Sequence, residues 1–419
     1  MIKKKPLIIT LIVVLVFLIS LIFVIDRAAN SPKYQQKLFG TFFKTFMILP
    51  DTVKSSIMIL SGKRSFSNLF NDYNVKFLPE TQYIQVELNR KKINLEKKSR
   101  NTFYIDTFKD NLIFATKYSK FYKVKFEELK NTKKNLNFEQ FSTKGLSNLK
   151  GNIYDISVSG NKIYVSKSSQ FKDCNRLEIY FAEIKEILDF QVFKSFDECL
   201  SIGMGTSRIK DFNFNGEEGI LITTQDADND KPGLKSQDDS SIFGKTVFVN
   251  KKTKTHEVFS KGHRNAQGLF IKDEIILSTE HGPRGGDEIN RIEYKKNYGW
   301  PIVSYGNAYH NKELKYLKGH KENGFEEPIY AFVPSIGISE LIILPNSFNP
   351  KWKFNALITS LNGRSIYRAK FEDESFRKII YVEKIYIGER IRDIKYVDKL
   401  NFIVVALERT GDIGIIKNK

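Results

Sequence analysis

Residues 111–125 read NLIFATKYSKFYKVK, two short β-rich runs joined by a polar turn. The first run, NLIFAT, begins after a turn signal and ends on a small residue and a hydroxyl residue. The second run, from Phe121, follows the polar turn and reads as a second strand. The two runs predict one antiparallel hairpin, and the fold follows from its repetition.

The same hairpin recurs six times along the chain. Copies of the first run are NLIFAT from Asn111, NKIYVS from Asn161, GILITT from Gly219, EIILST from Glu274, NALITS from Asn355 and NFIVVA from Asn401. The partner runs are FYKVKF from Phe121, RLEIYF from Arg176, KTVFVN from Lys245, EINRIE from Glu288, SIYRAK from Ser365 and IGIIKN from Ile413. Leu112 and Phe402 are 290 residues apart, so the five intervals average 58, enough for a four-stranded sheet with its loops.

Radial repetition of such sheets predicts an all-β fold, a six-bladed β-propeller over residues 76–419. Residues 84–88 are expected to close the ring by pairing into the last blade. The widest interval, between Ile275 and Ala356, must hold a large loop insertion, residues 295–324, and propellers receive ligands on such loops. A β-sandwich is the structural alternative, but it gives no reason for regular spacing.

The composition excludes a minimal peptide and a globally disordered chain, since 41% of the 419 residues are apolar. The net charge of +19 invites a nucleic-acid reading. The basic residues are scattered through apolar stretches, however, whereas nucleic-acid binders concentrate charge on one face. We therefore predict no nucleic-acid partner and interpret the charge as a matter of composition, with an anionic membrane surface or an acidic ligand as the weaker alternative.

The N-terminus carries an uncharged run, residues 6–25, preceded by three lysines and followed by Asp26 and Arg27. This run is long enough to span a bilayer. We predict an uncleaved transmembrane signal-anchor over residues 1–27, with cleavage near Ala28 and Ala29 as the alternative. Residues 28–75 are expected to form a helical membrane-proximal stalk. The expected location is the bacterial inner membrane, single-pass, with the propeller in the periplasm.

The two cysteines, Cys174 and Cys199, bracket a predicted hairpin. A disulfide across it is plausible outside the cytoplasm, and two free buried thiols are the alternative.

The densest cluster of unusual residues is the segment 262–305, GHRNAQGLFIKDEIILSTEHGPRGGDEINRIEYKKNYGWPIVSY. Its glycines and prolines fix sharp loops around Asp287 and Glu288. Oxygen-rich turns of this kind suit Ca²⁺, which takes carboxylate and carbonyl ligands. GGDE alone is a weak signal, because an acidic turn is usually only solvated.

This segment closely resembles the glucose/sorbosone dehydrogenase family, which comprises soluble quinoprotein glucose dehydrogenases and aldose sugar dehydrogenases. The resemblance is carried by Arg264 and Asn265, then EHGPRGGDEIN, NYGWP and VSYG in order, and by GERIRDI at residues 388–394. Weaker similarity at SQDDSSIFGK and PSIGIS extends it over most of residues 80–419. It implies a six-bladed propeller that uses pyrroloquinoline quinone (PQQ) and Ca²⁺ to oxidise a sugar.

The resemblance also implies roles for individual residues. Arg264, Asn265, Arg390 and Arg392 would hold the cofactor, a planar tricarboxylate that suits guanidinium forks. The carbonyls of Gly282 and Pro283 would bind the cofactor-side Ca²⁺. Ligands of a second, structural Ca²⁺ would be Glu288 and the carbonyl of Tyr298, with Asp287 as a further candidate.

The chain departs from the family where a proton is abstracted. The family's catalytic histidine aligns with Met204, in GMGTSRIKDF, and a thioether has no useful basicity. Asp226 resembles the family's base-orienting aspartate and is the candidate substitute base, with a solvated loop carboxylate as the alternative. His281 sits in the cofactor loop, where a family histidine is common and is not the base. A family glutamine is replaced by Lys150, and a family lysine by Asn362.

Two hypotheses therefore stand. The first is a membrane-anchored sugar dehydrogenase that oxidises C1 of an aldose to a lactone and passes electrons to an unknown periplasmic or membrane acceptor, with Asp226 or a water in place of the histidine. The second is a catalytically degenerate propeller that acts as a periplasmic carbohydrate- or protein-binding module, as related propellers do in hedgehog-interacting proteins. Three arginines converging on one channel favour the first.

Overall fold

The structure, a computed structural model, describes residues 86–93, 95, 101–131, 133–146, 151–171, 174–200, 205–226, 234–308 and 315–418. The predicted anchor (1–27) and stalk (28–75) lie outside these ranges, as do Met204 and Lys150. Of the helices in the described ranges, none is long and apolar enough to cross a bilayer.

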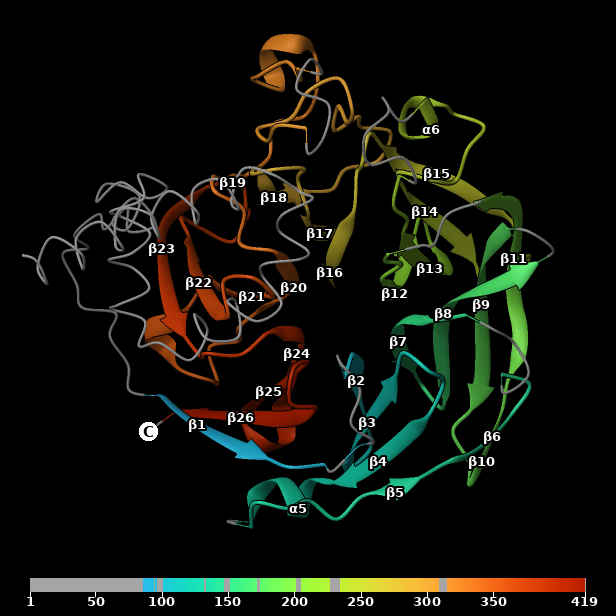
Figure 1. Cartoon of the computed structure of the whole chain (residues 1–419), viewed down its shortest axis with the longest axis vertical. Helices are drawn as coiled ribbons and strands as arrows, with labels where there is room; N and C mark the ends of the chain where they lie inside the picture. The colour runs from blue at the N-terminus through green and yellow to red at the C-terminus, as the bar shows by residue number, and fades with distance from the viewer. Residues whose placement is uncertain are drawn as a thin grey trace, which may run out of the picture. The chain divides into compact units, whose positions relative to one another are not determined.

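Six four-stranded antiparallel sheets surround a common axis, which confirms the predicted six-bladed propeller (Figure 1). Blade 1 holds β2 (Phe103–Phe108), β3 (Asn111–Thr116), β4 (Phe121–Lys125) and β5 (Glu139–Gln140). Blade 2 holds β7 (Ile153–Ser159), β8 (Lys162–Phe171), β9 (Cys174–Glu183) and β11 (Gln191–Leu200). Blade 3 holds β12 (Ile209–Phe214), β13 (Glu217–Thr223), β14 (Lys245–Asn250) and β15 (His256–Lys261).

The remaining blades follow the same plan. Blade 4 holds β16 (Ala266–Lys272), β17 (Ile275–Glu280), β18 (Asp287–Arg291) and β19 (Tyr330–Phe332). Blade 5 holds β20 (Ile338–Ile343), β21 (Asn355–Ser360), β22 (Ser365–Phe371) and β23 (Ile379–Tyr386). Blade 6 holds β24 (Ile391–Val397), β25 (Phe402–Leu407), β26 (Asp412–Asn418) and β1 (Val86–Lys91).

Short elements lie in the loops, most of them between two strands of the same blade. A parallel pair is formed by β6 (Ser142–Lys144) and β10 (Ile187–Asp189). The described part of the chain has the helices α5 (Phe126–Lys130) and α6 (Leu234–Gln237), with single 3₁₀ turns η1 (Lys321–Asn323), η2 (Pro350–Trp352) and η3 (Asp398–Leu400). The six predicted hairpins correspond to the second and third strands of the six blades.

The ring is closed by the N-terminal strand of the described chain. Strand β1 pairs antiparallel with β26, from Val86 opposite Asn418 to Lys91 opposite Ile413. Blade 6 therefore takes three strands from the C-terminus and one from the N-terminal side. This confirms the predicted closure: residues 86–88 of the expected range lie in β1, which continues to Lys91, and residues 84 and 85 lie outside the described residues.

The hydrophobic core lies between the blades, in six clusters that each join two neighbours. Between blades 1 and 6, for example, Phe103 and Phe114 share a cluster with Val404 and Ile415, all fully buried. Burying one such side chain contributes about 1.5–3 kcal/mol. Each blade therefore buries apolar side chains against the blades on both sides of it.

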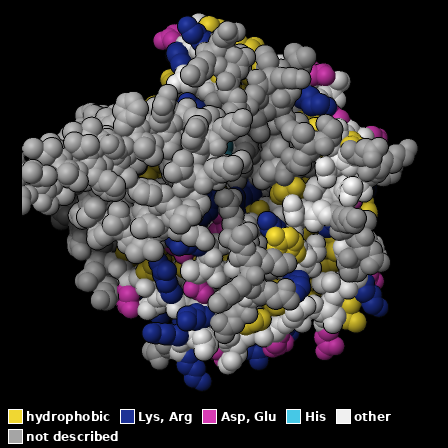
Figure 2. Space-filling view, in the orientation of Figure 1, with side chains coloured by type: hydrophobic (Ala, Val, Ile, Leu, Met, Phe, Trp, Pro, Cys, Tyr) yellow, Lys and Arg dark blue, Asp and Glu magenta, His cyan; other side chains and the backbone are white. Residues whose placement is uncertain are grey.

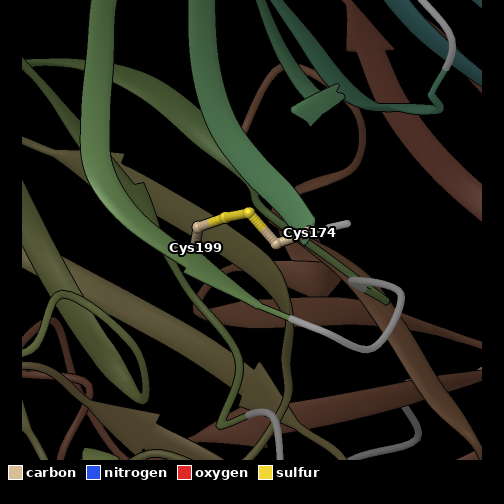
Figure 3. Close-up of a disulfide and its surroundings, with 2 residues drawn as sticks. All are labelled: Cys174 and Cys199. Carbon is tan, nitrogen blue, oxygen red and sulfur yellow. A yellow bond between two sulfur atoms is a disulfide. The ribbon is translucent and has the colours of Figure 1, made fainter. Parts of the chain in front are cut away.

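Cys174 and Cys199 form a disulfide in blade 2 (Figure 3). Their Cα atoms are 5.8 Å apart, within the usual range for a disulfide. The bond joins the start of β9 to the end of β11, its antiparallel partner. The disulfide alternative of the sequence analysis is thus the one that the structure adopts.

One arginine side chain reaches all five other blades. Arg208, 1% exposed, lies directly before β12, and its Nη1 is 3.1 Å from Asp155 Oδ1, 3.3 Å from Glu340 Oε2 and 3.2 Å from Asp393 Oδ1. Its remaining donors reach the backbone of blades 4 and 6, at the carbonyls of Gln267 and Arg392, and its guanidinium lies 5.1 Å from the ring centre of Tyr104 in blade 1. We call Arg208, Asp155, Glu340 and Asp393 the Arg208 cluster.

The same carboxylates also bind backbone of the next blade. Asp155 accepts from the Ile209 N–H (3.0 Å) and Asp393 from the Ile105 N–H (2.8 Å). Glu340 accepts from the Leu269 N–H at 2.9 Å. Each carboxylate thus neutralises part of a buried charge and fixes the innermost strand of a neighbouring blade.

We expect Arg208→Met to lower the free energy of unfolding by about 3–5 kcal/mol. The variant leaves the buried carboxylates with the more distant Lys210 ammonium, 3.7 Å from Asp155 Oδ2 and 3.9 Å from Glu340 Oε2, in place of the guanidinium. Urea unfolding of the purified chain measures the loss. Arg377→Met is the matched control, since Arg377 is 61% exposed and pairs with Glu293 on the surface, where an ion pair contributes at most about 1 kcal/mol. Equal losses in the two variants would contradict the role given to Arg208.

Asp393 should make stability depend on pH. Burial raises the pKa of its carboxyl to about 7, from an ordinary 3.8, although Arg208 acts in the opposite direction. The folded state then holds this proton more tightly than the unfolded chain, so the stability it contributes is full below about pH 4 and is lost as pH rises through 7. Asp393→Asn should flatten that fall in urea-unfolding measurements across pH 4–8. Asp110→Asn, at an exposed position, should leave the profile unchanged.

Candidate functional site

The candidate site lies at the end of the propeller where the innermost strands begin. Arg264 and Asn265 precede β16, while Arg390 precedes β24 and Arg392 lies within it. Arg392 Nη1 donates to Gln267 Oε1 (3.0 Å), and Gln267 Nε2 donates to Asn265 Oδ1 (2.7 Å). The structure therefore joins residues from blades 4 and 6 that the sequence analysis assigned to one site. We call the region formed by Arg264, Asn265, Gln267, Arg390 and Arg392 the channel mouth.

Glu408, at the end of β25, binds two arginines of the channel mouth. Arg390 Nε lies 2.8 Å from Glu408 Oε2, and Arg392 Nη2 lies 2.8 Å from Glu408 Oε1. Burial raises the pKa of Glu408, but Arg392, Arg390 and the Thr102 hydroxyl outweigh it and lower the pKa to about 2. Glu408 is therefore ionised at neutral pH and orients both guanidiniums.

The sequence analysis missed Glu408 and its counterpart in blade 4, Glu280. Glu280 ends β17 and accepts hydrogen bonds from the backbone N–H groups of Arg264 and Asn265 and from His263 Nδ1. Glu280 is the last residue of β17, and Glu408 directly follows β25. An acid within two residues of the end of the repeated run is the signal that could have identified them.

Arg264 is held between an indole ring and a loop. Its guanidinium carbon lies 5.2 Å from the ring centre of Trp300, and its Nη1 donates to the carbonyls of His281 and Gly282, both at 3.0 Å. The Trp300 Nε1–H donates to Asp226 Oδ2 at 2.9 Å, and the Asp226 N–H donates to the Arg264 carbonyl at 2.7 Å. Asp226 therefore braces the residues around Arg264.

Asp226 is only 2% exposed. The alternative of a solvated loop carboxylate is wrong, because the side chain lies under Trp300 rather than in water. Its assignment as the substitute base stays a prediction. The described residue closest in sequence to Met204 is Gly205, whose N–H donates to the neighbouring Gln225 side chain at 2.6 Å.

The predicted calcium loop is tightly built. Asp287 Oδ1 accepts from the Gly282 N–H (3.1 Å), and its Oδ2 accepts from the N–H groups of Ile336 and Ile338 (3.0 Å each). Gly286, with φ of +69°, lies where a Cβ would stand 2.5 Å from the Gly306 nitrogen. Asp287 thus fastens the loop of Gly282 and Pro283 to blade 5, and only glycine fits the turn beside it.

Glu288 borders a small cavity beside this loop. The cavity is about 10 Å³, enough for about one water-sized occupant, and its lining includes Glu280, Glu288, Tyr298 and His320. Burial, followed by the charge of Glu280, raises the pKa of Glu288 well above its ordinary value. His320 Nε2 lies 3.5 Å from Glu288 Oε1. Glu280 and Glu288 both border this small cavity, and a cation in it would allow both carboxylates to be ionised at once.

These residues fit a cation whose ligands are mainly backbone oxygens. Across the described ranges, no three His, Cys, Asp or Glu side chains are grouped as metal ligands. Calcium accepts carbonyl and water oxygens as well as carboxylates, so Glu288 and the Tyr298 carbonyl would supply two of its six to eight ligands. The Gly282 carbonyl, assigned to the other Ca²⁺, here accepts a hydrogen bond from Arg264.

The channel mouth also fits an anionic cofactor. His281 Nε2 is buried without a hydrogen-bond partner among the described residues. Burial lowers the pKa of His281, and the charges of Arg392 and Arg264 add to this effect. An orphaned ring nitrogen beside two guanidiniums is suited to a ligand that brings oxygen acceptors. Asn362 lies exposed in the loop after β21, and its N–H donates to the Ile336 carbonyl.

The chain resembles known proteins in sequence and fold. The model of the Glucose / Sorbosone dehydrogenase family matches residues 207–414. Aldose sugar dehydrogenase YliI of Escherichia coli is 28% identical over 203 residues, 47% of this chain and 54% of that protein. The chain spans about half the length of the curated relatives it matches.

Solved structures share the propeller. The soluble aldose sugar dehydrogenase of E. coli, in its apo-form, superposes with a TM-score of 0.63 at 19% identity, over 80% of this chain and 100% of that one. The PQQ-bound aldose sugar dehydrogenase of Streptomyces coelicolor gives 0.56 at 16% identity, over 80% and 99%. At these identities the likeness establishes the fold. Residues 207–414 are thus similar in sequence to the glucose/sorbosone dehydrogenase family, and the solved structures share the fold of the propeller.

Proposed function

We propose that this chain is a PQQ- and Ca²⁺-dependent sugar dehydrogenase that oxidises C1 of an aldose to a lactone. The observation that carries the proposal is the meeting of Arg264, Asn265, Arg390 and Arg392 at one channel mouth. A structural ion pair would need one guanidinium for Glu408, but two are held there. The surplus positive charge suits a ligand with several carboxylates.

The chain's own residues would divide the work. Arg390, whose side chain is 24% exposed, and Arg392 present their guanidiniums in an orientation fixed by Glu408. Arg264, fixed over Trp300, would face the same ligand. Glu288 and the Tyr298 carbonyl would hold one Ca²⁺, and the Gly282 and Pro283 carbonyls the other. When bound, the quinone supplies the two-electron acceptor, and Ca²⁺ beside it acts as a Lewis acid.

Removal of the C1 hydroxyl proton needs a base. Since the family histidine position is Met204, we propose Asp226 or a water at the channel mouth. Asp226 lies one hydrogen bond from Trp300 and its backbone is bound to Arg264, so it is close to the cofactor residues. Its burial means that the proton would reach it through a water or after Trp300 moves.

The apolar run at residues 6–25 supports a further part of the proposal. We infer that it anchors the chain in the bacterial inner membrane and leaves the propeller in the periplasm, where a disulfide such as Cys174–Cys199 persists. The reduced cofactor would pass its electrons to an acceptor there or in the membrane.

We expect the purified chain to bind PQQ in the presence of Ca²⁺, and Arg392→Met to weaken that binding at least about tenfold, the cost of one charge-assisted hydrogen bond. Cofactor absorbance during titration measures both affinities. Arg409→Met is the matched control, because Arg409 is exposed near Glu408 without being placed at the site. Bleaching of the bound cofactor by an aldose would then establish turnover. Binding without bleaching would favour the binding-module hypothesis, and no binding would overturn the cofactor assignment.

If Asp226 is the base, Asp226→Asn should lower kcat by about 10²–10⁴-fold while the cofactor affinity stays unchanged. Stopped-flow reduction of the bound cofactor by sugar separates these two quantities. Asp238→Asn, at an exposed position, is the control. An unchanged kcat would leave water as the proton acceptor. An increase in kcat in Met204→His would then measure the contribution of a histidine at this position.

A further inference from the structure

A separate cavity lies at the outer edge of the ring, away from the channel mouth. It is formed by β1 and by the segment that follows α5, and its volume is about 780 Å³. This volume is in the usual range of small-ligand sites, about 300–1,000 Å³. We call it the β1–α5 cleft.

The lining of the β1–α5 cleft is strongly basic. Seven of its side chains are Lys or Arg and two are acidic, Glu87 and Asp412. Dark-blue side chains gather over the part of the surface where Figure 1 places β1 and α5 (Figure 2). Closure of the ring brings basic residues near 90, 130 and 417 together here, although they are far apart in the sequence.

The two walls of the cleft are fastened to each other. Lys91, only 4% exposed, donates to the carbonyl and the side-chain oxygen of Asn131 and to the Lys133 carbonyl (2.7 Å). The Lys92 N–H donates to the Lys134 carbonyl at 2.7 Å, and the Leu136 N–H donates to the Lys92 carbonyl at 3.1 Å. The cleft is thus preformed rather than dependent on a ligand for its shape.

Three lysines around the cleft have no direct ion-pair partner within the described ranges, although the charge of Lys133 helps to lower the pKa of the Glu128 carboxyl. The exposed ammonium groups of Lys92, Lys133 and Lys134 make no ion pair or hydrogen bond within the described ranges. Lys417 adds a fourth positive charge, with its Nζ 4.3 Å from the ring centre of Phe402. Burial lowers the pKa of Lys91, and the charge of Lys417 lowers it further, as expected where like charges crowd together.

Ammonium groups act as point charges. They bind phosphate oxygens without the planar bidentate geometry of a guanidinium–carboxylate pair. Several of them spread over one concave surface match an anion that carries several charges. We propose that the β1–α5 cleft binds a multivalent phosphate anion, either a free one or the headgroup of an anionic phospholipid. The site is independent of the proposed sugar oxidation, because none of its residues lies at the channel mouth.

The test uses the full chain in a nonionic detergent, with inorganic tripolyphosphate as the probe. Isothermal titration calorimetry should show binding that weakens as salt is added. The triple variant Lys92→Gln, Lys133→Gln, Lys134→Gln should bind at least tenfold more weakly. The matched control removes the same charge from exposed positions elsewhere, Lys252→Gln, Lys272→Gln and Lys351→Gln, and should bind like the unmodified chain. Thermal unfolding of both triple variants confirms that they are folded.

Competition identifies the source of the phosphate. If dihexanoyl phosphatidylglycerol displaces tripolyphosphate and dihexanoyl phosphatidylcholine does not, the cleft binds an anionic lipid headgroup. If neither lipid displaces it, the cleft binds a free phosphate anion. Absence of tripolyphosphate binding, or an equal loss in the control triple variant, would overturn the proposal.

Discussion

Arg208 carries a positive charge where the other five blades converge, and the burial of that charge is the constraint on which the rest of the propeller depends. A guanidinium removed from water costs several kcal/mol unless every donor is matched. Here it is matched by three carboxylates, two backbone carbonyls and the face of Tyr104. Because these partners lie on the innermost strands of all five other blades, two of them on β24, satisfying one side chain fixes the position of all the blades.

The Arg208 cluster also explains why the channel mouth is ordered. Arg208 donates to the carbonyls of Gln267 and Arg392, and the side chains of these two residues are hydrogen-bonded to each other. The guanidinium that joins the blades therefore also fixes the backbone at Gln267 and Arg392, beside the proposed cofactor residues. Glu408 orients the guanidiniums of Arg390 and Arg392. Glu280 binds the backbone N–H groups of Arg264 and Asn265. Stability and site geometry share one network.

The strands could be predicted because their signal is local. A run such as NALITS at 355–360 carries its turn, its apolar pattern and its end within a few residues, and it folds as β21 with those bounds. The Arg208 cluster could not be predicted, because its members are separated by 53 residues at Asp155 and 185 at Asp393, and nothing near Arg208 in sequence marks it as buried. The proposed site falls between these cases. Its residues were found through family resemblance, whereas Glu408, which orients two of them, depends on a contact across β24 and β25.

The pairing of β1 with β26 has a consequence for the order of synthesis. Residues 86–91 leave the ribosome more than three hundred residues before their partners at 412–418. Throughout that interval β1 has no strand to pair with, and blade 6 does not exist. A contact so distant in sequence is slow to form, because the chain between its ends must first be ordered. A chain without β26 would leave the ring open and would also lack one wall of the β1–α5 cleft, so both features depend on the same strand.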